Sequence, residues 1–268
     1  MKKTLFIIGA FLLAQVLAGV VIAVGFIMTV TSQGEAAAEN YQPGSTEMLT
    51  ALMISDIAII VATILICRKG WAEPFRWKMP AGKGVFTIVL SLIGAAGLII
   101  LTEALAEKLN LPDLMADTFQ AVSLSPLALW AIALIGPLAE EVACRYGIAG
   151  SLLEQKKWAP WAVILVSAII FAVLHMNPAQ MLVAFIIGVY LGWLYIVTGS
   201  LWPCIICHVA NNAVSVMIMR EFPDATPDEQ TLTALIGNGS SYTALLCGSA
   251  VILVLVIIAL CKATRTSR

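Results

Sequence analysis

The chain has 268 residues, of which 60% are apolar and only 12% charged, with a formal net charge of −1 and a mean hydropathy of +0.96. A soluble domain is roughly 45–50% apolar and about 25% charged, and much of its surface has to be covered by polar groups. The composition therefore excludes the soluble classes, among them nucleic-acid binders, secreted disulfide-rich modules and cytosolic nucleotide-binding enzymes.

Eight apolar stretches approach the ~20 residues that a helix needs to cross ~30 Å of hydrocarbon. They lie at residues 4–30, 49–67, 85–106, 124–150, 159–176, 180–198, 201–219 and 242–261. None of the intervals between them is long enough for a soluble domain. The sequence therefore predicts an all-α polytopic membrane protein of about eight transmembrane helices, with residues 1–268 forming one transmembrane domain.

The basic residues predict the orientation of these spans. With the N-terminus in the cytoplasm, eight crossings return the C-terminus to the same side. All of the 15 basic residues except Lys108 and Arg220 then fall inside, including those of segment 68–84 and of the last residues after span 242–261. Cytoplasmic segments of membrane proteins carry such an excess of Lys and Arg, so both termini are predicted to be cytoplasmic.

Polar side chains within the spans are functional candidates, because an ionisable group is costly in a membrane. Span 49–67 carries Asp56, which has no partner visible in the sequence; we interpret it as a helix–helix contact or a marginal site residue. The remaining candidates lie further along the chain and are Glu140, Glu141, Arg145, His175, His208, Asn211 and Asn212. The two histidines are the only ones in the chain.

Span 124–150 carries two adjacent carboxylates. Glu141 and Arg145 are four residues apart and share a helix face, so they are expected to pair. Glu140 lies about 100° further round the helix and faces a different environment. Two carboxylates in different environments often take separate acid–base roles. The structural alternative is an ion-pair network beside a carboxylate at the water interface.

Span 159–176 carries Phe171 and His175, again four residues apart. The turn after span 124–150 lies near Lys156, and an antiparallel hairpin about this turn places Glu140 within one helical turn of His175. Pro178 follows and must break the helix. The alternative for His175 is a packing residue with its hydrogen bonds satisfied.

The next two spans add a packing motif and a second pair of polar side chains. Gly188 and Gly192 in span 180–198 form a small-x-x-x-small face, typical of close helix packing. His208 and Asn212 in span 201–219 share one helix face and aim two donors at one place; hydrogen bonding between helices is the alternative. The six cysteines lie in or beside spans, where Cys usually behaves as a small apolar residue.

Together these side chains suit the attack of water on an amide. A carboxylate and a histidine can activate water, and two donors can stabilise an oxyanion, each contributing about 3–4 kcal/mol in measured cases. No Ser or Cys stands at a defined spacing from a histidine and an acid, so covalent catalysis is not indicated.

Three motifs, in this order and on separate spans, resemble the CPBP intramembrane proteases, a family that includes the type II CAAX prenyl endopeptidases and the bacterial Abi proteins. The motifs are Glu140-Glu141-x-x-x-Arg145, Phe171-x-x-x-His175 and His208-x-x-x-Asn212. The resemblance covers residues 125–215. It implies an intramembrane endopeptidase with a cavity open to the cytoplasm, in the plasma membrane or bacterial inner membrane.

By this resemblance Glu140 activates water with help from His175, while His208 and Asn212 form the oxyanion hole. The residues expected to support them are Glu141, Arg145 and Phe171. We expect no cofactor. Zinc held by Glu140, His175 and His208 is the less favoured alternative, because no H-E-x-x-H motif is present.

The expected partners are a peptide or membrane-protein substrate and the lipid bilayer, without nucleic acid. The sequence does not indicate the substrate, its prenylation or the oligomeric state. Two rival functions stay open. One is a non-catalytic membrane scaffold or regulator of the bacteriocin-immunity type. The other is an ion- or proton-coupled transporter, because buried Glu and His also mark ion pathways.

Overall fold

The fold is described from a computed structural model that covers residues 2–33, 44–67, 84–223 and 231–265. The basic residues between 68 and 83, and Arg268, on which part of the predicted orientation depends, lie outside these described residues. Within them the chain is helical and forms no strand, which confirms the all-α fold class.

The helices follow the predicted spans closely. The elements are α1 Lys2–Gln33, α2 Ser45–Cys67, α3 Gly84–Leu109, α4 Ala116–Ser123, η3 Leu129–Ile135, α5 Gly136–Glu141, η4 Val142–Ala149, α6 Gly150–Glu154, α7 Pro160–Val173, α8 Pro178–Thr198, α9 Trp202–Glu221, α10 Leu232–Ile236 and α11 Ser240–Arg265. The successive stretches from η3 to α6 replace the fourth predicted span. Each of the eight predicted spans therefore has a helical counterpart.

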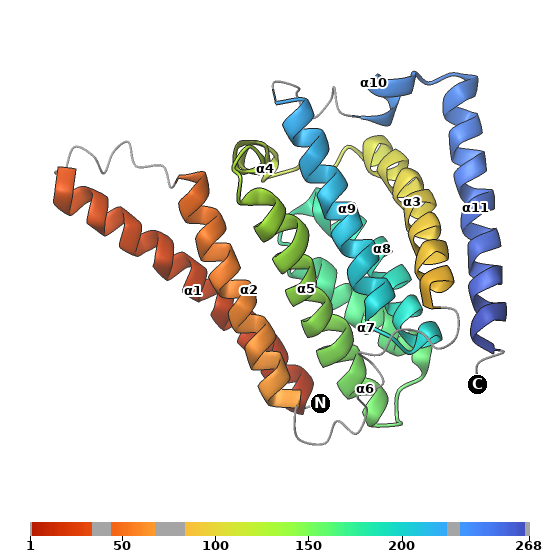
Figure 1. Cartoon of the computed structure of the whole chain (residues 1–268), viewed down its shortest axis with the longest axis horizontal. Helices are drawn as coiled ribbons and strands as arrows, with labels where there is room; N and C mark the ends of the chain where they lie inside the picture. Colours follow the sequence, from red (N-terminus) through yellow and green to blue (C-terminus); the bar gives the residue numbers. More distant parts are fainter. Residues whose placement is uncertain (1, 34–43, 68–83, 224–230, 266–268) are drawn as a thin grey trace.

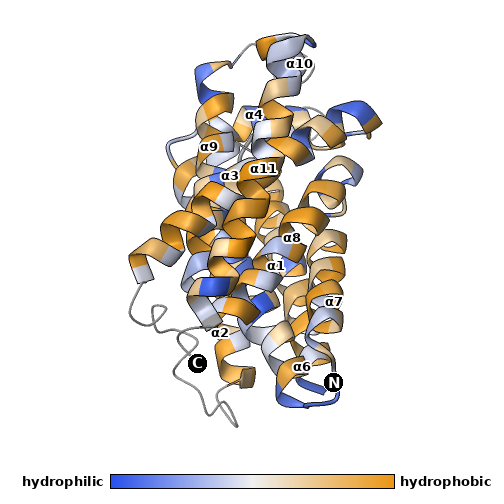
Figure 2. Cartoon of the chain, turned by 90° about the vertical axis from the view of Figure 1, so that its right-hand side faces the viewer, coloured by the Kyte–Doolittle hydropathy of each residue, from blue (hydrophilic) through white to orange (hydrophobic). Residues whose placement is uncertain are grey.

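Among the described residues, six helices are long and apolar enough to cross a membrane: α1, α2, α3, α8, α9 and α11. α7 is a shorter apolar helix. Apolar residues make up most of each long helix, and polar residues are more frequent towards the helix ends (Figure 2). The chain is thus a multi-pass membrane protein, while the count of eight crossings and the side of the termini stay predictions.

The long helices pack side by side in one bundle, and both ends of the described chain lie at the same end of it. α1 begins and α11 ends at the same end of the bundle, α1 and α2 lie at one side, and α11 packs on α3 at the other (Figure 1). At the shared end Lys3 on α1 bonds Glu154 on α6 at 2.9 Å, and Thr4 bonds Ser151 at 2.8 Å. α5 lies between α2 and α9, which places the Glu140–Glu141 pair inside the bundle.

The continuous helix from Leu129 to Glu154 changes its winding three times, from π to α at Gly136, back to π at Val142 and to α again at Gly150. Two π-helical stretches, η3 and η4, flank the short α-helical turns of α5 that carry both glutamates. Such π-helical segments are rare and often occur at functional sites. Pro137 contributes to this pattern because it has no backbone N–H to donate.

α7 ends where the sequence predicts a break. The backbone of Met176 is left-handed, with φ of 48°, and Pro178 then begins α8 with Asn177 at the N-cap. α7 and α8 pack closely: a Cβ added at Gly188 would lie 3.1 Å from the Phe171 ring and 3.3 Å from Ala168. The predicted small-residue packing face is therefore confirmed, and it brings α8 against Phe171.

Candidate active site

A fully buried ion pair forms the base of the site. Arg145 Nη1 donates to Glu141 Oε1 at 2.7 Å, and neither side chain is exposed. Arg145 also donates through Nη2 to the carbonyl of Gly188 at 3.2 Å, and its guanidinium lies 4.5 Å from the Phe171 ring centroid. The predicted pairing of Glu141 with Arg145 is thus confirmed, and Arg145 links its own helix to α7 and α8.

His208 lies between the two adjacent glutamates. Its Nδ1 is 2.9 Å from Glu141 Oε1, and its Nε2 is 3.4 Å from Glu140 Oε2. The Glu140 side chain keeps 25% of its surface exposed, whereas that of His208 keeps 6%. The two carboxylates do face different environments, as predicted. Nothing in the sequence indicated, however, that α9 would bring one imidazole to both carboxylates.

The hydrogen-bond partners of His208 restrict where protons lie. A carboxylate only accepts, so Nδ1 must carry a hydrogen when it bonds Glu141. The 3.4 Å approach of Nε2 to Glu140 Oε2 is favourable when one more proton is present, either on Nε2 or on Glu140. In both cases the group of Glu140, Glu141, Arg145 and His208 has no net charge, which suits a buried position.

Phe171 joins the two histidines. Its ring contacts the imidazole of His175 edge-on at a centroid distance of 4.8 Å, and that of His208 at 5.6 Å. The two imidazoles therefore flank one phenyl ring, and their centroids cannot be further apart than the sum of these distances. This places His175 near the cluster that Glu140, Glu141, Arg145 and His208 form.

His175 has a defined orientation. Its Nδ1 lies 2.9 Å from the carbonyl of Phe171. A carbonyl only accepts, so Nδ1 carries the hydrogen and Nε2 of the neutral ring is left as an acceptor. Among the described residues His175 makes no hydrogen bond to either glutamate.

Asn212 lies one helical turn beyond His208. Its Nδ2 donates to the carbonyl of Ile132 at 3.0 Å, and its Oδ1 accepts from Asn211 at 3.1 Å. The Ile132 carbonyl is free to accept because Pro137, five residues on, has no N–H, and the N–H of Gly136 bonds Ala131 instead. One of the two amide hydrogens of Asn212 is thus engaged, and the other stays available for a ligand.

Asn177 is a buried polar residue that the sequence reasoning did not select. Its Nδ2 donates to Asp113 at 2.8 Å and its Oδ1 accepts from the N–H of Leu114 at 3.1 Å. These bonds fix the turn between α7 and α8, two residues after His175, to the segment before α4. The N-cap position before Pro178 was the available signal.

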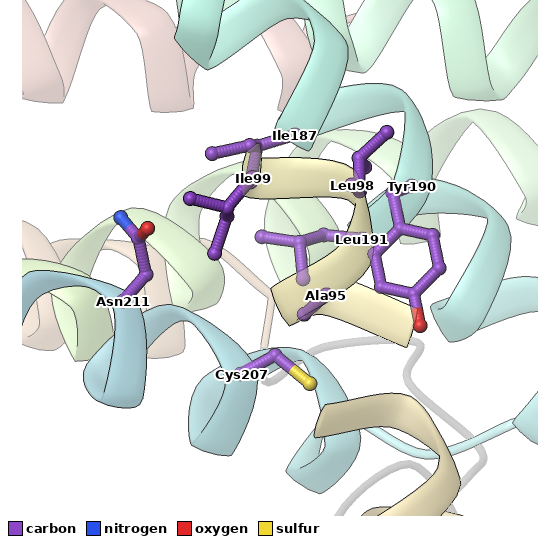
Figure 3. Close-up of a pocket in the computed structure, with 8 residues that line it drawn as sticks. All are labelled: Ala95, Leu98, Ile99, Ile187, Tyr190, Leu191, Cys207 and Asn211. Carbon is purple, nitrogen blue, oxygen red and sulfur yellow. The ribbon is translucent and has the colours of Figure 1, made fainter. Parts of the chain in front are cut away.

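A small apolar pocket lies beside the site and does not coincide with it. Its walls come from α3, α8 and α9, and Asn211 is at one edge (Figure 3). None of Glu140, Glu141, His175 or His208 lines it. Asn211 connects the pocket with the site through its bond to Asn212.

The part of the chain that the structure describes contains no group of three His, Cys, Asp or Glu side chains that could hold a metal ion. Glu140, His175 and His208, the alternative zinc ligands, do not form such a group, and the expectation of no cofactor stays a prediction. Four of the cysteines are buried as predicted, whereas Cys247 is exposed and Cys261 is partly exposed.

Comparisons with known proteins relate this chain to membrane peptidases. Residues 122–214 match the family model described as "Type II CAAX prenyl endopeptidase Rce1-like". A curated protein of Bacillus subtilis (strain 168), named "Putative membrane peptidase YdiL", is 28% identical over 193 residues, which are 67% of this chain and 77% of that protein. No solved structure gives a significant match.

These matches support a CAAX-type, Rce1-like membrane protease of the CPBP family, the resemblance that the sequence motifs indicated. A bacterial inner membrane is consistent with the origin of the relative. Every residue of the cluster, from Glu140 to Asn212, falls within the matched region, whereas Asp56 does not.

Proposed function

We propose that this membrane protein is an intramembrane endopeptidase that hydrolyses a peptide bond with water activated by Glu140. The substrate is a peptide or a membrane protein reached within the bilayer. The observation that carries this proposal is the position of His208, whose two ring nitrogens face Glu140 and the fully buried Glu141. This contact orients an imidazole and supplies a proton beside a carboxylate that is still partly exposed.

In the first step Glu140 takes a proton from a water molecule as the water oxygen attacks the carbonyl carbon of the substrate. The carbonyl oxygen becomes an oxyanion. The Nε2–H of His208 and the free amide hydrogen of Asn212 donate to it, as expected of an oxyanion hole. Glu141 supports this role because its bond to Nδ1 fixes the ring, and Arg145 compensates the charge of Glu141.

In the second step the C–N bond breaks and Glu140 passes its proton to the leaving nitrogen. The products are a new carboxyl terminus and a new amine, and the site returns to its starting proton count. His175 assists through Nε2, which its bond to the Phe171 carbonyl leaves as a proton acceptor. Such general acid–base assistance typically contributes 10²- to 10⁴-fold in rate.

Comparison of the peptides in membranes that carry the wild-type protein or Glu140→Gln tests this function. The substitution keeps the size of the side chain and removes its ability to take the proton. Glu103→Gln is the matched control, because it makes the same change in α3 at a residue outside the cluster.

We expect new N-terminal peptides in the wild-type and Glu103→Gln membranes that are absent with Glu140→Gln. The same peptides in all three samples would contradict the proposal. A phenotype that survives Glu140→Gln without any cleavage would favour a scaffold or regulator, and ion flux across vesicles would favour a transporter.

A further inference from the structure

His175 lies beyond the regular part of α7, so the helix alone does not fix its position. α7 ends at Val173, and the N–H groups of His175 and Met176 bond the carbonyls three residues back, at 3.1 and 3.2 Å. The backbone of Met176 is left-handed, with φ of 48°, which residues other than Gly rarely adopt. Its side chain is 72% exposed, so its packing does little to hold this turn. Contacts from elsewhere must therefore hold the turn that carries His175.

Asn177 makes such contacts through its side chain. It is fully buried at the N-cap of α8, yet among the described residues its side chain makes no capping bond to that helix. Asn at an N-cap usually makes one. Here the amide bonds two groups outside α8: Nδ2 donates to Asp113 Oδ1 at 2.8 Å, and Oδ1 accepts from the N–H of Leu114 at 3.1 Å. Both hydrogen-bonding ends of the amide thus hold the turn after His175 to the segment between α3 and α4.

The segment that receives these bonds is itself ordered by hydrogen bonds. Asp113 Oδ1 also accepts from the N–H of Met115 at 2.9 Å, which orients the carboxylate towards Asn177. The N–H of Ala179 donates to the carbonyl of Pro112 at 3.4 Å, beside the two bonds of Asn177. The start of α8 is therefore attached to a defined acceptor.

We propose that Asn177 is a positioning residue for His175, with Asp113 as the acceptor on which it depends. The inference rests on the function proposed above, in which His175 assists through Nε2. The Nδ1–H of His175 donates to the Phe171 carbonyl at 2.9 Å and leaves Nε2 as the acceptor. Without the bonds of Asn177 the left-handed turn relaxes and the ring moves away from this carbonyl. A displacement of a reacting group by about 1 Å can cost about 10²-fold in rate.

Cleavage kinetics of the full-length protein in lipid vesicles test this role. Asn177→Ala and Asp113→Ala each remove one partner of the bond. Each should lower kcat by about 10²-fold and keep KM close to wild type, because His175 acts on the reaction and not on substrate binding. An unchanged kcat in both variants would contradict the inference. Asp113 is exposed, so its variants serve even where Asn177→Ala fails to fold.

Asp113→Asn is the matched control. It removes the charge but keeps an oxygen that can accept from Asn177 and from the N–H of Met115. This variant should keep the wild-type kcat. A loss in Asp113→Asn as large as that in Asp113→Ala would mean that the charge of Asp113, and not its bond to Asn177, is what matters, and would overturn the inference.

The same substitutions in a His175→Gln background show whether Asn177 acts through His175. With the positioned group absent, Asn177→Ala and Asp113→Ala should lower the remaining kcat by no more than about twofold. A loss of about 10²-fold in both backgrounds would show that the bond supports the fold in general, and would refute a role in positioning His175.

Nitrogen-15 NMR of protein labelled at histidine reads the state of His175 without any substrate. The chain has only His175 and His208, so His175→Gln assigns the signals. At a single pH of about 9, where imidazoles are ordinarily neutral, Nδ1 of His175 should carry the hydrogen in wild type and Asp113→Asn. In Asn177→Ala and Asp113→Ala the hydrogen should be shared between Nδ1 and Nε2, with the signals of His208 unchanged. The same His175 signals in all samples would overturn the inference, also where cleavage by His175→Gln is too slow to measure.

This inference and the proposed function fail in different ways. Full cleavage by Glu140→Gln would refute the proposed function, and the NMR signals would still decide whether Asn177 holds His175. An inactive Glu140→Gln with wild-type kcat in both Asn177→Ala and Asp113→Ala would refute the role of Asn177 alone.

Discussion

One oxygen of Glu141 serves two partners. Oε1 accepts from Arg145 at 2.7 Å and from His208 at 2.9 Å, while Oε2 has no partner among the described residues. The carboxylate therefore neutralises a buried cation and also orients the imidazole of His208. Loss of this group should affect stability and activity together.

The buried pair of Glu141 and Arg145 should contribute strongly to the free energy of unfolding. Glu141→Ala leaves Arg145 buried without an anion, and removal of one partner of a buried pair typically costs about 3–5 kcal/mol. The free energy of unfolding in mixed micelles measures this cost. Replacement of both residues, Glu141→Leu with Arg145→Met, should cost less than Glu141→Ala because no uncompensated charge is left. A single variant that unfolds within about 1 kcal/mol of wild type would contradict this account.

Asn212→Ala should separate activity from stability. Loss of one oxyanion donor typically lowers kcat by about 10²- to 10³-fold, whereas loss of the neutral bond to Ile132 should cost only about 1 kcal/mol of stability. Cleavage rates and unfolding free energies measure the two effects. Ser215→Ala, one turn further along α9, is the control. An unchanged kcat would remove Asn212 from the oxyanion hole.

The residue pairs within each helix were predictable from the sequence, because side chains four residues apart must share a face. Glu141 with Arg145 is the example that the structure confirms. The contact of His208 with both glutamates was not predictable, because it depends on how α9 crosses α5. The contact of Asn212 with Ile132 had a signal in Pro137, which frees that carbonyl, but the sequence does not show which donor reaches it.

At the scale of helices, the closeness of α7 and α8 sets the position of Phe171 between the histidines. Gly188→Ala introduces a Cβ at 3.1 Å from the Phe171 ring and 3.3 Å from Ala168. Such overpacking typically costs about 1–3 kcal/mol, and it should also lower the cleavage rate because Phe171 has to move.

Gly192→Ala is the matched control for this pair of helices. Its Cβ would meet neighbours only at 3.4 Å or more, which is ordinary contact. We expect it to unfold closer to wild type than Gly188→Ala and to keep its cleavage rate. Equal effects of the two substitutions on stability and rate would contradict the specific role of the Gly188 contact.

Helix positions were more predictable than helix winding. The apolar runs indicated each long helix, and Pro178 indicated the break after α7. The π-helical stretches η3 and η4 and the short helices α4 and α10 were not predicted. Apolar periodicity does not distinguish α from π winding in a helix that is apolar on most of its faces, and α4 is too short to give a clear period.

At the scale of the whole molecule, the bundle exposes many large apolar side chains along its outer helices, among them Leu5, Leu13 and Val85. In water these would form a large apolar surface; in a bilayer they face lipid. α1 begins and α11 ends at the same end of the bundle, which agrees with an even number of crossings.

Topology reporters test the predicted orientation. The excess of Lys and Arg at this end predicts that it is cytoplasmic. Alkaline phosphatase, which is active only outside the cytoplasm, should be inactive when fused after residue 268 and active when fused between α9 and α10. The opposite pattern would reverse the orientation and place the shared end of the bundle outside.

The proposed chemistry is that Glu140 activates water for attack on a peptide bond and His208 stabilises the resulting oxyanion. The most direct test incubates the purified protein in vesicles, in ¹⁸O-labelled water, with the uncut precursor of a peptide that the comparison of wild-type and Glu140→Gln membranes identifies. We predict that the wild-type protein and Glu103→Gln place one ¹⁸O atom in each new carboxyl terminus, while Glu140→Gln forms no product. Labelled product formed by Glu140→Gln at the wild-type rate would contradict the account.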